Sequence, residues 1–257
     1  LENCENVIHL AALIGIPYSY LSPLAYLKTN IEGTYNILQA TKELDNFKDI
    51  IITSSSEVYG SGEVFPMNEK HSLNAQSPYS ATKISADSIS LSFFRSFDLP
   101  ITILRPFNNY GPRQSNRAII PTIISQFLND KNFIEIGNKN TIRDFTYVTD
   151  TAKAFFAILG RENHGEIFNI SFGKEISIDD LINKVSSITK ITKEIKQSNI
   201  RVRPIKSEVN RLLGDSNKFR TLTNWSPLIN LEEGLSNTIE WIKNSEKNLK
   251  NSSHYIV

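Results

Sequence analysis

The sequence predicts an α/β fold: a doubly wound parallel sheet with a smaller C-terminal lobe. Three apolar, β-branched runs support the sheet, at residues 7–12, 49–53 and 101–104. They lack alternating polar positions, as is typical of strands buried on both faces. Longer helical stretches separate the runs, and strand–helix–strand order at this spacing indicates right-handed crossovers between parallel strands.

The two stretches between these strands begin with the same helix start signal. Ser22-Pro23 and Ser77-Pro78 each place a capping residue before a proline, which is favoured at the first helical position. Helices are therefore predicted over residues 23–44 and 78–97.

The pattern changes after Gly111-Pro112, which predicts the start of a second unit. Strands are expected at residues 133–136 and 167–170. Helices are expected at 121–128, at 150–159 with Asp150 as the cap, and after the capping-box pairs Ser177/Asp180 and Asn230/Glu233.

Composition excludes several classes of protein. The 257 residues include 28 Lys and Arg against 27 Asp and Glu, and this near balance argues against a nucleic-acid binder. The single cysteine, Cys4, rules out an internal disulfide and a multi-cysteine zinc site, so we expect no metal and a reducing, cytoplasmic location. The longest apolar stretch, residues 7–16, is too short to span a bilayer, and no signal peptide or membrane partner is expected.

Tyr79 and Lys83 form the strongest chemical signal. They lie four residues apart in the first turns of the predicted helix 78–97, so they share one face. An adjacent ammonium and the helix N-terminus would favour the phenolate, which makes Tyr79 a candidate general base. Such a pair alone is more often a surface contact on an amphipathic helix.

Polar residues follow the predicted strand 49–53. Ser54-Ser55-Ser56-Glu57 comes at its carboxyl end, where side chains of a parallel sheet line the ligand crevice. A serine there can hydrogen-bond a substrate oxygen while Tyr79 takes its proton, and Glu57 can take a second proton. Taken alone, the run is more often a polar exit from a strand.

Together these residues resemble the extended short-chain dehydrogenase/reductase family, and in particular its NAD-dependent sugar-nucleotide epimerases and dehydratases. Ser55, Tyr79 and Lys83 match the catalytic Ser/Thr–Tyr–Lys triad. Four further segments are similar to family motifs in the same order: His9-Leu10-Ala11-Ala12, Asn30 to Thr34, Arg105 to Pro112 and Arg143 to Asp150. A fifth, from Arg203 to Asp215, resembles the phosphate-side arginine segment.

The resemblance implies a Rossmann-like fold and a set of site residues. Residues 1–112 and 144–170 would form a partial NAD-binding domain, and residues 113–143 and 171–257 a nucleotide-sugar-binding lobe. The implied catalytic residues are Ser55, Ser56, Glu57, Tyr79 and Lys83. The implied cofactor contacts are Ala11, Ala12, Asn30, Tyr79, Lys83 and Pro106. The implied substrate contacts are Asn108, Arg143, Arg203 and, more weakly, Arg211, since guanidinium groups bind phosphate bidentately.

One family element is absent from the sequence. No G-x-x-G-x-x-G turn is present to place a dinucleotide pyrophosphate at a helix N-terminus, and residue 1 is Leu rather than Met. We therefore expect an N-terminally truncated chain whose complete form binds NAD. The choice between NAD and NADP depends mainly on the missing segment and stays open.

The residues beside the triad bear on the reaction. Glu57, two positions after Ser55, resembles the T-S-E arrangement of GDP-mannose dehydratases, which favours a 4,6-dehydratase. The epimerase alternative stays open, and so does a UDP-glucuronate decarboxylase, although that class has a different tyrosine motif. A non-enzymatic nucleotide-binding module is the remaining alternative.

Two finer expectations follow from the resemblance. Residues 11–20 look like the 4,6-dehydratases of bacterial legionaminic-acid-type pathways, which act on a nucleotide-linked N-acetylhexosamine. The complete protein is expected to be a homodimer that packs through the helices containing Asn30 and Tyr79. Apolar residues on outer helix faces motivate this expectation: Ile84, Ile89, Leu91 and Phe94.

Overall fold

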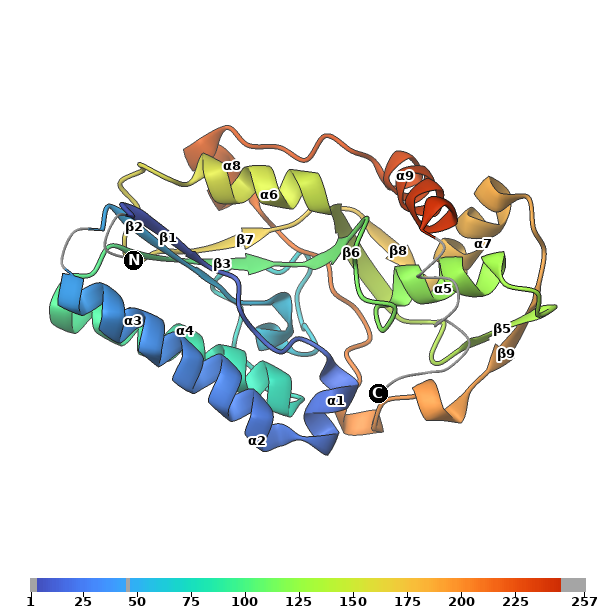
Figure 1. Cartoon of the computed structure of the whole chain (residues 1–257), viewed down its shortest axis with the longest axis horizontal. Helices are drawn as coiled ribbons and strands as arrows, with labels where there is room; N and C mark the ends of the chain where they lie inside the picture. Colours follow the sequence, from blue (N-terminus) through green and yellow to red (C-terminus); the bar gives the residue numbers. More distant parts are fainter. Residues whose placement is uncertain (1–3, 45–46, 246–257) are drawn as a thin grey trace.

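The computed structural model describes residues 4–44 and 47–245, which form a central parallel sheet and a lobe beyond its carboxyl edge (Figure 1). The sheet has the order β1-β2-β3-β7, and all neighbouring strands are parallel. Its strands are β1 (Asn6–His9), β2 (Asp49–Thr53), β3 (Ile101–Pro106) and β7 (Ile167–Ile170). The predicted parallel arrangement is confirmed.

Both faces of the sheet are covered by helices, as the unalternated strand sequences predicted (Figure 1). Ile50 and Ile52 of β2 pack in the cluster that includes Leu38 of α3 (Gly33–Leu44) and residues of α4 (Pro78–Phe97). Ile51 points the other way, toward α6 (Val148–Ala157) and α8 (Asn217–Thr223). Consecutive strand residues face opposite sides, so one apolar run serves two cores.

The first βα unit differs from the prediction in two respects. Strand β1 ends at His9, whereas the sequence indicated a strand to residue 12. The single helix expected over residues 23–44 is divided into α2 (Pro23–Tyr26), a π-helical segment (Leu27–Glu32) and α3, and α1 (Ile16–Leu21) precedes it. Residues 10–15 therefore form an open connection at the carboxyl end of the sheet.

The lobe contains two small sheets and three helices around its own core. In the first sheet, β6 (Ile142–Tyr147) lies between the parallel β4 (Asn108–Tyr110) and the antiparallel β8 (Glu175–Ser177). The second sheet pairs β5 (Phe133–Ile136) with β9 (Glu194–Gln197). The helices are α5 (Ile119–Leu128), α7 (Ile178–Thr189) and α9 (Leu231–Asn244).

Three short 3-10 helices complete the fold: Ser56–Tyr59, Asn199–Arg201 and Ile205–Ser207. The division into two units at residues 112, 143 and 170 stays a prediction. It assigns α8 to the lobe, whereas Phe219 of α8 packs against the central sheet. Across the described ranges, no helix is long and apolar enough to cross a membrane.

Candidate active site

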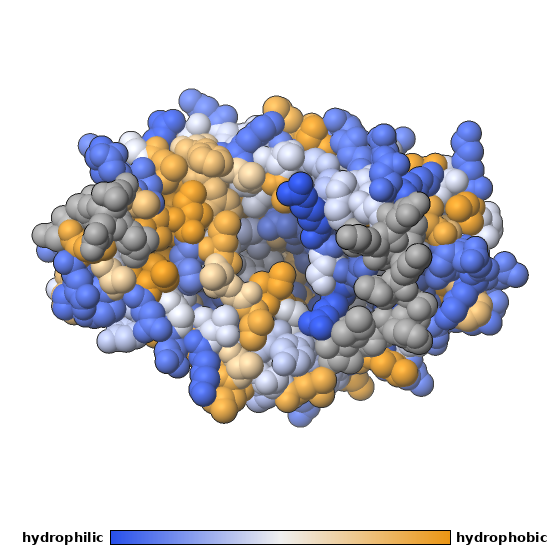
Figure 2. Space-filling model, viewed as in Figure 1, coloured by the Kyte–Doolittle hydropathy of each residue, from blue (hydrophilic) through white to orange (hydrophobic). Residues whose placement is uncertain are grey.

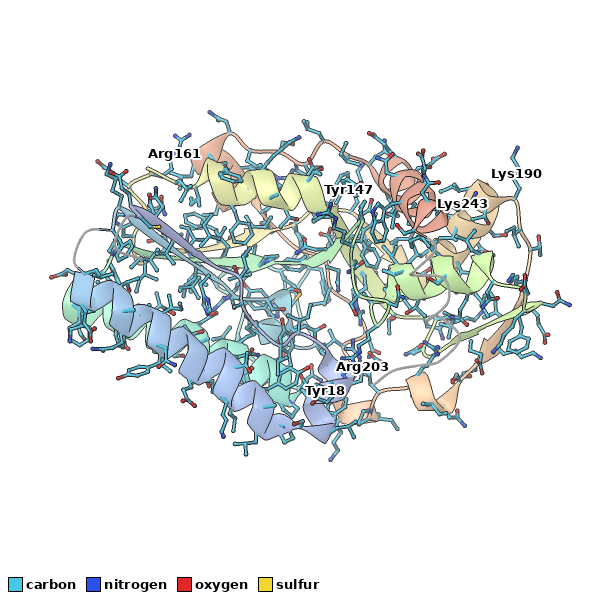
Figure 3. The ribbon with its side chains drawn as sticks, viewed as in Figure 1. Tyr18, Tyr147, Arg161, Lys190, Arg203 and Lys243 are labelled. Carbon is cyan, nitrogen blue, oxygen red and sulfur yellow. The ribbon has the colours of Figure 1, made fainter. Side chains whose placement is uncertain are left out.

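A cavity of about 450 Å³ lies between the carboxyl end of the sheet and the lobe. The exits of β1, β2 and β3 line one side, at Leu10, Thr53 and Pro106, and β6 of the lobe lines the other. Figure 2 shows the molecule hollowed near the middle of this face. Tyr18 from α1 and Arg203 from the segment after β9, both labelled in Figure 3, also line the cavity.

The N-terminus of α4 carries the Tyr79/Lys83 pair into this cavity. Ser77 caps the helix by accepting a hydrogen bond from the Ser80 backbone N–H at 3.1 Å, as its sequence predicted. Both Tyr79 and Lys83 are 6% exposed. The Lys83 Nζ donates to the Thr53 carbonyl oxygen at 2.8 Å, which ties α4 to the end of β2.

The electrostatic expectation for Tyr79 was wrong in one respect. Burial raises the pKa of the Tyr79 phenol above its ordinary value, and the Glu57 carboxylate raises it further. The hydrogen bond with Ser55 acts in the opposite direction and lowers this pKa. The Lys83 ammonium is itself penalised, because burial lowers the pKa of Lys83 to about 8. The protein alone therefore does not favour the phenolate.

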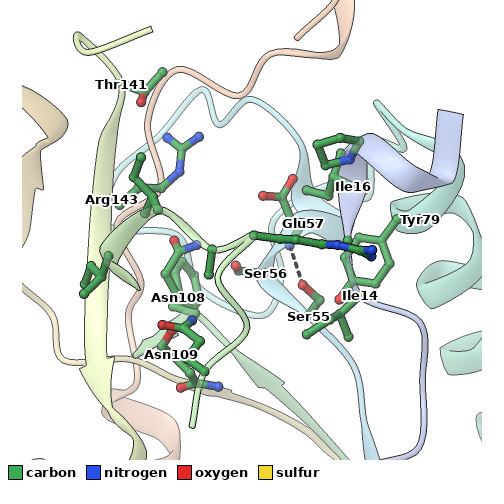
Figure 4. A pocket seen from close by; sticks show the side chains of 18 of the residues that line it. Ile14, Ile16, Ser55, Ser56, Glu57, Tyr79, Asn108, Asn109, Thr141 and Arg143 are labelled. Carbon is green, nitrogen blue, oxygen red and sulfur yellow. Dashed lines mark hydrogen bonds between the residues drawn. The ribbon is translucent and has the colours of Figure 1, made fainter. Parts of the chain in front are cut away.

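The serines and Glu57 lie at the start of the 3-10 helix Ser56–Tyr59. Ser55 caps it, and its Oγ accepts a hydrogen bond from the Glu57 backbone N–H at 3.2 Å (Figure 4). This tight turn projects Ser55, Ser56 and Glu57 into the same cavity as Tyr79. The sequence prediction that β2 delivers these side chains to the site agrees with this placement.

Two arginines and a second carboxylate form the far side of the cavity. Arg143 of β6 is 6% exposed, and burial lowers its pKa to about 10, so it stays charged at neutral pH. Its Nη2 lies 3.7 Å from Oε1 of Glu208. The Nη1 of Arg203 lies 4.0 Å from the same Glu208 oxygen and 3.9 Å from Oε1 of Glu57.

The Arg203 Nη1 is buried but has no hydrogen-bond partner among the described residues. The same holds for Oδ1 of Asn108, on the first residue of β4, which also lines the cavity. Buried polar atoms are normally paired, so these two groups indicate that a polar ligand completes the site.

Three of the predicted site residues do not line the cavity. Asn30 is buried, and its amide holds the open connection after β1, accepting from the Leu13 N–H at 2.8 Å and donating to the Leu13 carbonyl. Ala11 in that connection is exposed. Arg211 forms a bidentate ion pair with Glu175, at 2.7 and 3.0 Å, and lies over the Phe65 ring. The expected direct contacts by Asn30, Ala11 and Arg211 stay predictions, and the lining of this cavity does not support them.

The structure adds residues that sequence reasoning did not assign. Glu208 is the most significant, because it lies beside both Arg143 and Arg203, and it shares Arg203 with Glu57. Gln114 and Arg117, from the loop before α5, also line the cavity. Glu208 lies in a segment that the resemblance already included, but nothing in its local sequence distinguishes it from a surface carboxylate.

Comparisons with known proteins agree with this geometry. The family model described as GDP-mannose 4,6 dehydratase matches residues 2–238. The chain belongs to this family. Its members include NAD-dependent nucleotide-sugar epimerases and dehydratases of the extended short-chain dehydrogenase/reductase type.

Epimerases and dehydratases are both among the curated and solved relatives. A UDP-glucuronate 4-epimerase of Thermodesulfobacterium geofontis is 33% identical over 95% of this chain and 74% of its own length. A dTDP-D-glucose 4,6-dehydratase of Dictyostelium discoideum is 35% identical over 73% of this chain, which spans 46% of that protein. The crystal structure of UDP-glucuronic acid 4-epimerase from Bacillus cereus, in complex with UDP-glucuronic acid and NAD, matches with a TM-score of 0.88 at 31% identity, covering 95% of this chain and 77% of that one.

The residues present fit the nicotinamide half of the family's cofactor. Ala12, Thr53, Lys83 and Pro106 form a wall at the carboxyl ends of the strands, where dinucleotides bind in such sheets. The buried hydroxyl of Thr53 has no hydrogen-bond partner among the described residues. A polar group bound beside Lys83 would satisfy it.

Proposed function

We propose that the protein is an NAD-dependent sugar-nucleotide 4,6-dehydratase. The observation that carries the proposal is the position of Glu57, whose carboxylate lines the same cavity as Tyr79 and is near enough to raise its pKa. Oxidation at C4 needs one base, and removal of the C5 proton needs another. Tyr79 and Glu57 supply two bases to one cavity.

Thr53, Lys83 and Pro106 would hold the nicotinamide, which would supply a hydride acceptor and, later, the hydride donor. Tyr79 takes the proton of the sugar 4-hydroxyl, while Ser55 hydrogen-bonds the same oxygen. Glu57 then takes the C5 proton, which the 4-ketone has acidified, and delivers a proton to the departing 6-hydroxyl. The sugar loses one hydrogen from C5 and one hydroxyl from C6, which together make one water. Return of the hydride to C6 and of a proton to C5, which Glu57 can deliver, would complete the 4-keto-6-deoxy sugar.

The arginines provide a binding site for the diphosphate of the substrate. The unpartnered Nη1 of Arg203 and the buried, charged Arg143 are suited to bidentate contact with phosphate oxygens. Asn108 supplies a free acceptor nearby, and we assign it to the sugar. The resemblance of residues 11–20 to legionaminic-acid-type dehydratases favours a nucleotide-linked N-acetylhexosamine as the substrate.

A 4-epimerase is the second candidate, because two of the three relatives described above are 4-epimerases. It would use Tyr79, Lys83 and Ser55 in the same first step and would leave Glu57 without a proton to remove. The role of Glu57 therefore separates the two reactions.

The test uses the complete gene product, including whatever residues precede Leu1, with UDP-N-acetylglucosamine, dTDP-glucose, GDP-mannose and UDP-glucuronate in deuterated water. A dehydratase forms a 4-keto-6-deoxy sugar with deuterium at C5. Glu57→Gln should lower this product about 10²–10⁴-fold, the usual contribution of a general base, and should leave nucleotide-sugar binding nearly unchanged. Tyr79→Phe should instead slow the initial hydride transfer.

Inversion at C4 without water loss, together with a Glu57→Gln variant of nearly wild-type rate, would establish the epimerase. Carbon dioxide released from UDP-glucuronate would establish a decarboxylase.

We further propose that the protein forms a homodimer through the helices after β1 and the helix α4. Leu24, Leu27, Tyr35 and Ile89 line a shallow groove on this face, with Lys28 and Glu32 in the same groove. Leu24 is 61% exposed. A two-fold axis across the groove would bring Lys28 of each copy toward Glu32 of the other.

Light scattering of the complete protein tests the dimer. Leu24→Glu should convert it to monomer, whereas Ile205→Glu, at a residue 92% exposed on another segment, should not. A dimer that survives Leu24→Glu unchanged, or a wild-type monomer at micromolar concentration, refutes the proposed interface.

A further inference from the structure

Behind the Tyr79/Lys83 pair lies a buried ion pair that the proposed mechanism does not use. Asp87 follows Lys83 by one turn of α4 and is 2% exposed, and Arg105 of β3 is also 2% exposed. The Arg105 Nε and Nη2 both donate to Oδ2 of Asp87, at 3.0 and 2.9 Å. Two donated N–H bonds from a guanidinium stabilise the ionised carboxylate.

The rest of the network fixes Arg105 in position. Its Nη1 donates to the Tyr59 hydroxyl at 3.1 Å, and its guanidinium lies over the Tyr59 ring. The Tyr59 hydroxyl in turn donates to Asn169 of β7 at 2.7 Å. Since Tyr59 ends the 3-10 helix that carries Glu57, the network joins the two catalytic segments to the sheet.

Both hydrogen bonds from the Arg105 guanidinium go to one oxygen of the Asp87 carboxylate, Oδ2. Its second oxygen, Oδ1, is buried and accepts no N–H from Arg105, and the neutral hydroxyl of Ser54 is the other polar group that acts on the carboxylate. Because both guanidinium bonds go to one oxygen, the other side of the carboxylate keeps a negative potential that no cation on β3 neutralises directly. Lys83 is the cation one helical turn away on the same face.

We propose that Asp87 is a positioning residue for Lys83, whose buried carboxylate, held by Arg105, keeps the Lys83 side chain charged within the closed site. Burial disfavours the charged ammonium of Lys83, and the negative charge of Asp87 opposes this effect and raises the pKa of Lys83. The inference rests on the proposed function, because a charged lysine beside the tyrosine is what that reaction needs.

Other groups around Lys83 do not substitute for Asp87. His9 of β1 is a neighbour, but burial and the Lys83 charge lower its pKa, so it stays neutral and adds no negative charge. The Thr53 carbonyl accepts one hydrogen bond but carries no formal charge. Further titratable groups on the neighbouring elements include Tyr79 on α4, Glu57 and Tyr59 on the 3-10 helix and Arg105 on β3, but Asp87 is the group whose charge raises the pKa of Lys83.

The test measures the ionisation of Lys83 directly. Protein labelled with ¹³C and ¹⁵N lysine is titrated by NMR, and the Lys83 signal is assigned by its loss in Lys83→Met. Wild-type Lys83 should titrate at a pH of about 8. Asp87→Asn keeps the shape of the side chain, removes its charge, and should move this titration down by about one unit or more.

Arg105→Gln is the matched control, because it breaks the same ion pair and leaves the Asp87 charge in place. It should move the Lys83 titration upward or not at all, whereas a purely structural role would move both variants in the same direction. If Asp87→Asn alone does not fold, the double variant Asp87→Asn/Arg105→Gln leaves neither charge buried without its partner and should still lower the titration.

The second readout is the pH profile of NADH formation in a single turnover with a nucleotide sugar. Its alkaline limb should move down in Asp87→Asn by the shift seen in the NMR titration. An unchanged Lys83 titration in Asp87→Asn, or an equal downward shift in Arg105→Gln, overturns the inference. If the titrations behave as expected but the wild-type protein forms no NADH with any substrate, the effect of Asp87 on Lys83 stands and the proposed function fails.

Discussion

The proposed diphosphate site leads to a quantitative prediction, because its two arginines lie beside carboxylates that a bound diphosphate would replace as their partners. The contacts of Glu208 to Arg143 and Arg203, at 3.7 and 4.0 Å, are longer than hydrogen bonds. When a diphosphate hydrogen-bonds Arg203, the protein therefore loses only weak contacts that it made in its free state. Charge-assisted hydrogen bonds contribute about 1.5–3 kcal/mol each, so Arg203→Gln should weaken nucleotide-sugar binding about 10–100-fold.

Arg143→Gln should weaken binding further. Arg143 is more deeply buried than Arg203, and its loss leaves Glu208 with one cationic partner instead of two. The remaining carboxylate charge would then repel the diphosphate. Glu208→Gln should act in the opposite direction and tighten binding a few-fold, because the two guanidinium groups lose a competing anion.

Isothermal titration calorimetry with UDP-N-acetylglucosamine, dTDP-glucose and GDP-mannose measures these effects without turnover. Arg211→Gln is the matched control, since this arginine is paired with Glu175 and does not line the cavity. The reasoning is refuted if Arg203→Gln binds as tightly as wild type, or if Arg211→Gln weakens binding as much as Arg203→Gln does.

Three further predictions concern stability, measured by urea unfolding. The pKa of Lys83 is about 8 in the folded protein and 10.5 in the unfolded chain, so its charge destabilises the fold fully below pH 8 and no longer above about pH 10.5. Lys83→Met should therefore raise the free energy of unfolding by up to about 3 kcal/mol at pH 7, and by progressively less toward pH 10.5. Asp144→Asn should lower the free energy of unfolding by about 2–5 kcal/mol. Both carboxylate oxygens of Asp144 accept hydrogen bonds from backbone N–H groups, including that of Gly214, and the amide nitrogen of asparagine cannot accept one. Gly234→Ala should lower the free energy of unfolding by about 1–3 kcal/mol, although alanine favours helices, because its Cβ would overlap the Tyr110 hydroxyl. The assigned contacts are contradicted if Lys83→Met brings no gain in stability at pH 7, or if Asp144→Asn or Gly234→Ala brings no loss.

The sequence by itself determined the parallel sheet and the helix that carries the Tyr79/Lys83 pair. Residues 49–53 have no polar alternation, so only a strand covered on both faces can bury them, and the structure confirms this. The Ser77-Pro78 start signal placed Tyr79 and Lys83 on one face because the helical repeat is local. Both inferences depend on residues that are neighbours in the chain.

The roles of long polar side chains were decided by the tertiary structure, because their partners are distant in sequence. Asp150, expected to cap α6, lies inside its first turn and accepts the backbone N–H groups of Leu228 and Ile229. Asn30, expected at the cofactor, holds the backbone of Leu13 instead.

Electrostatics were also beyond the sequence. A motif places Lys83 beside Tyr79, but the pKa of each depends on burial and on charges from other elements, so the phenol pKa rises where proximity alone suggested a fall. Arg203 and Arg211 belong to one motif segment, yet one lines the cavity and the other is neutralised by Glu175. The sequence specifies the charge of a side chain, but the fold determines whether that charge is exposed to water and which group it pairs with.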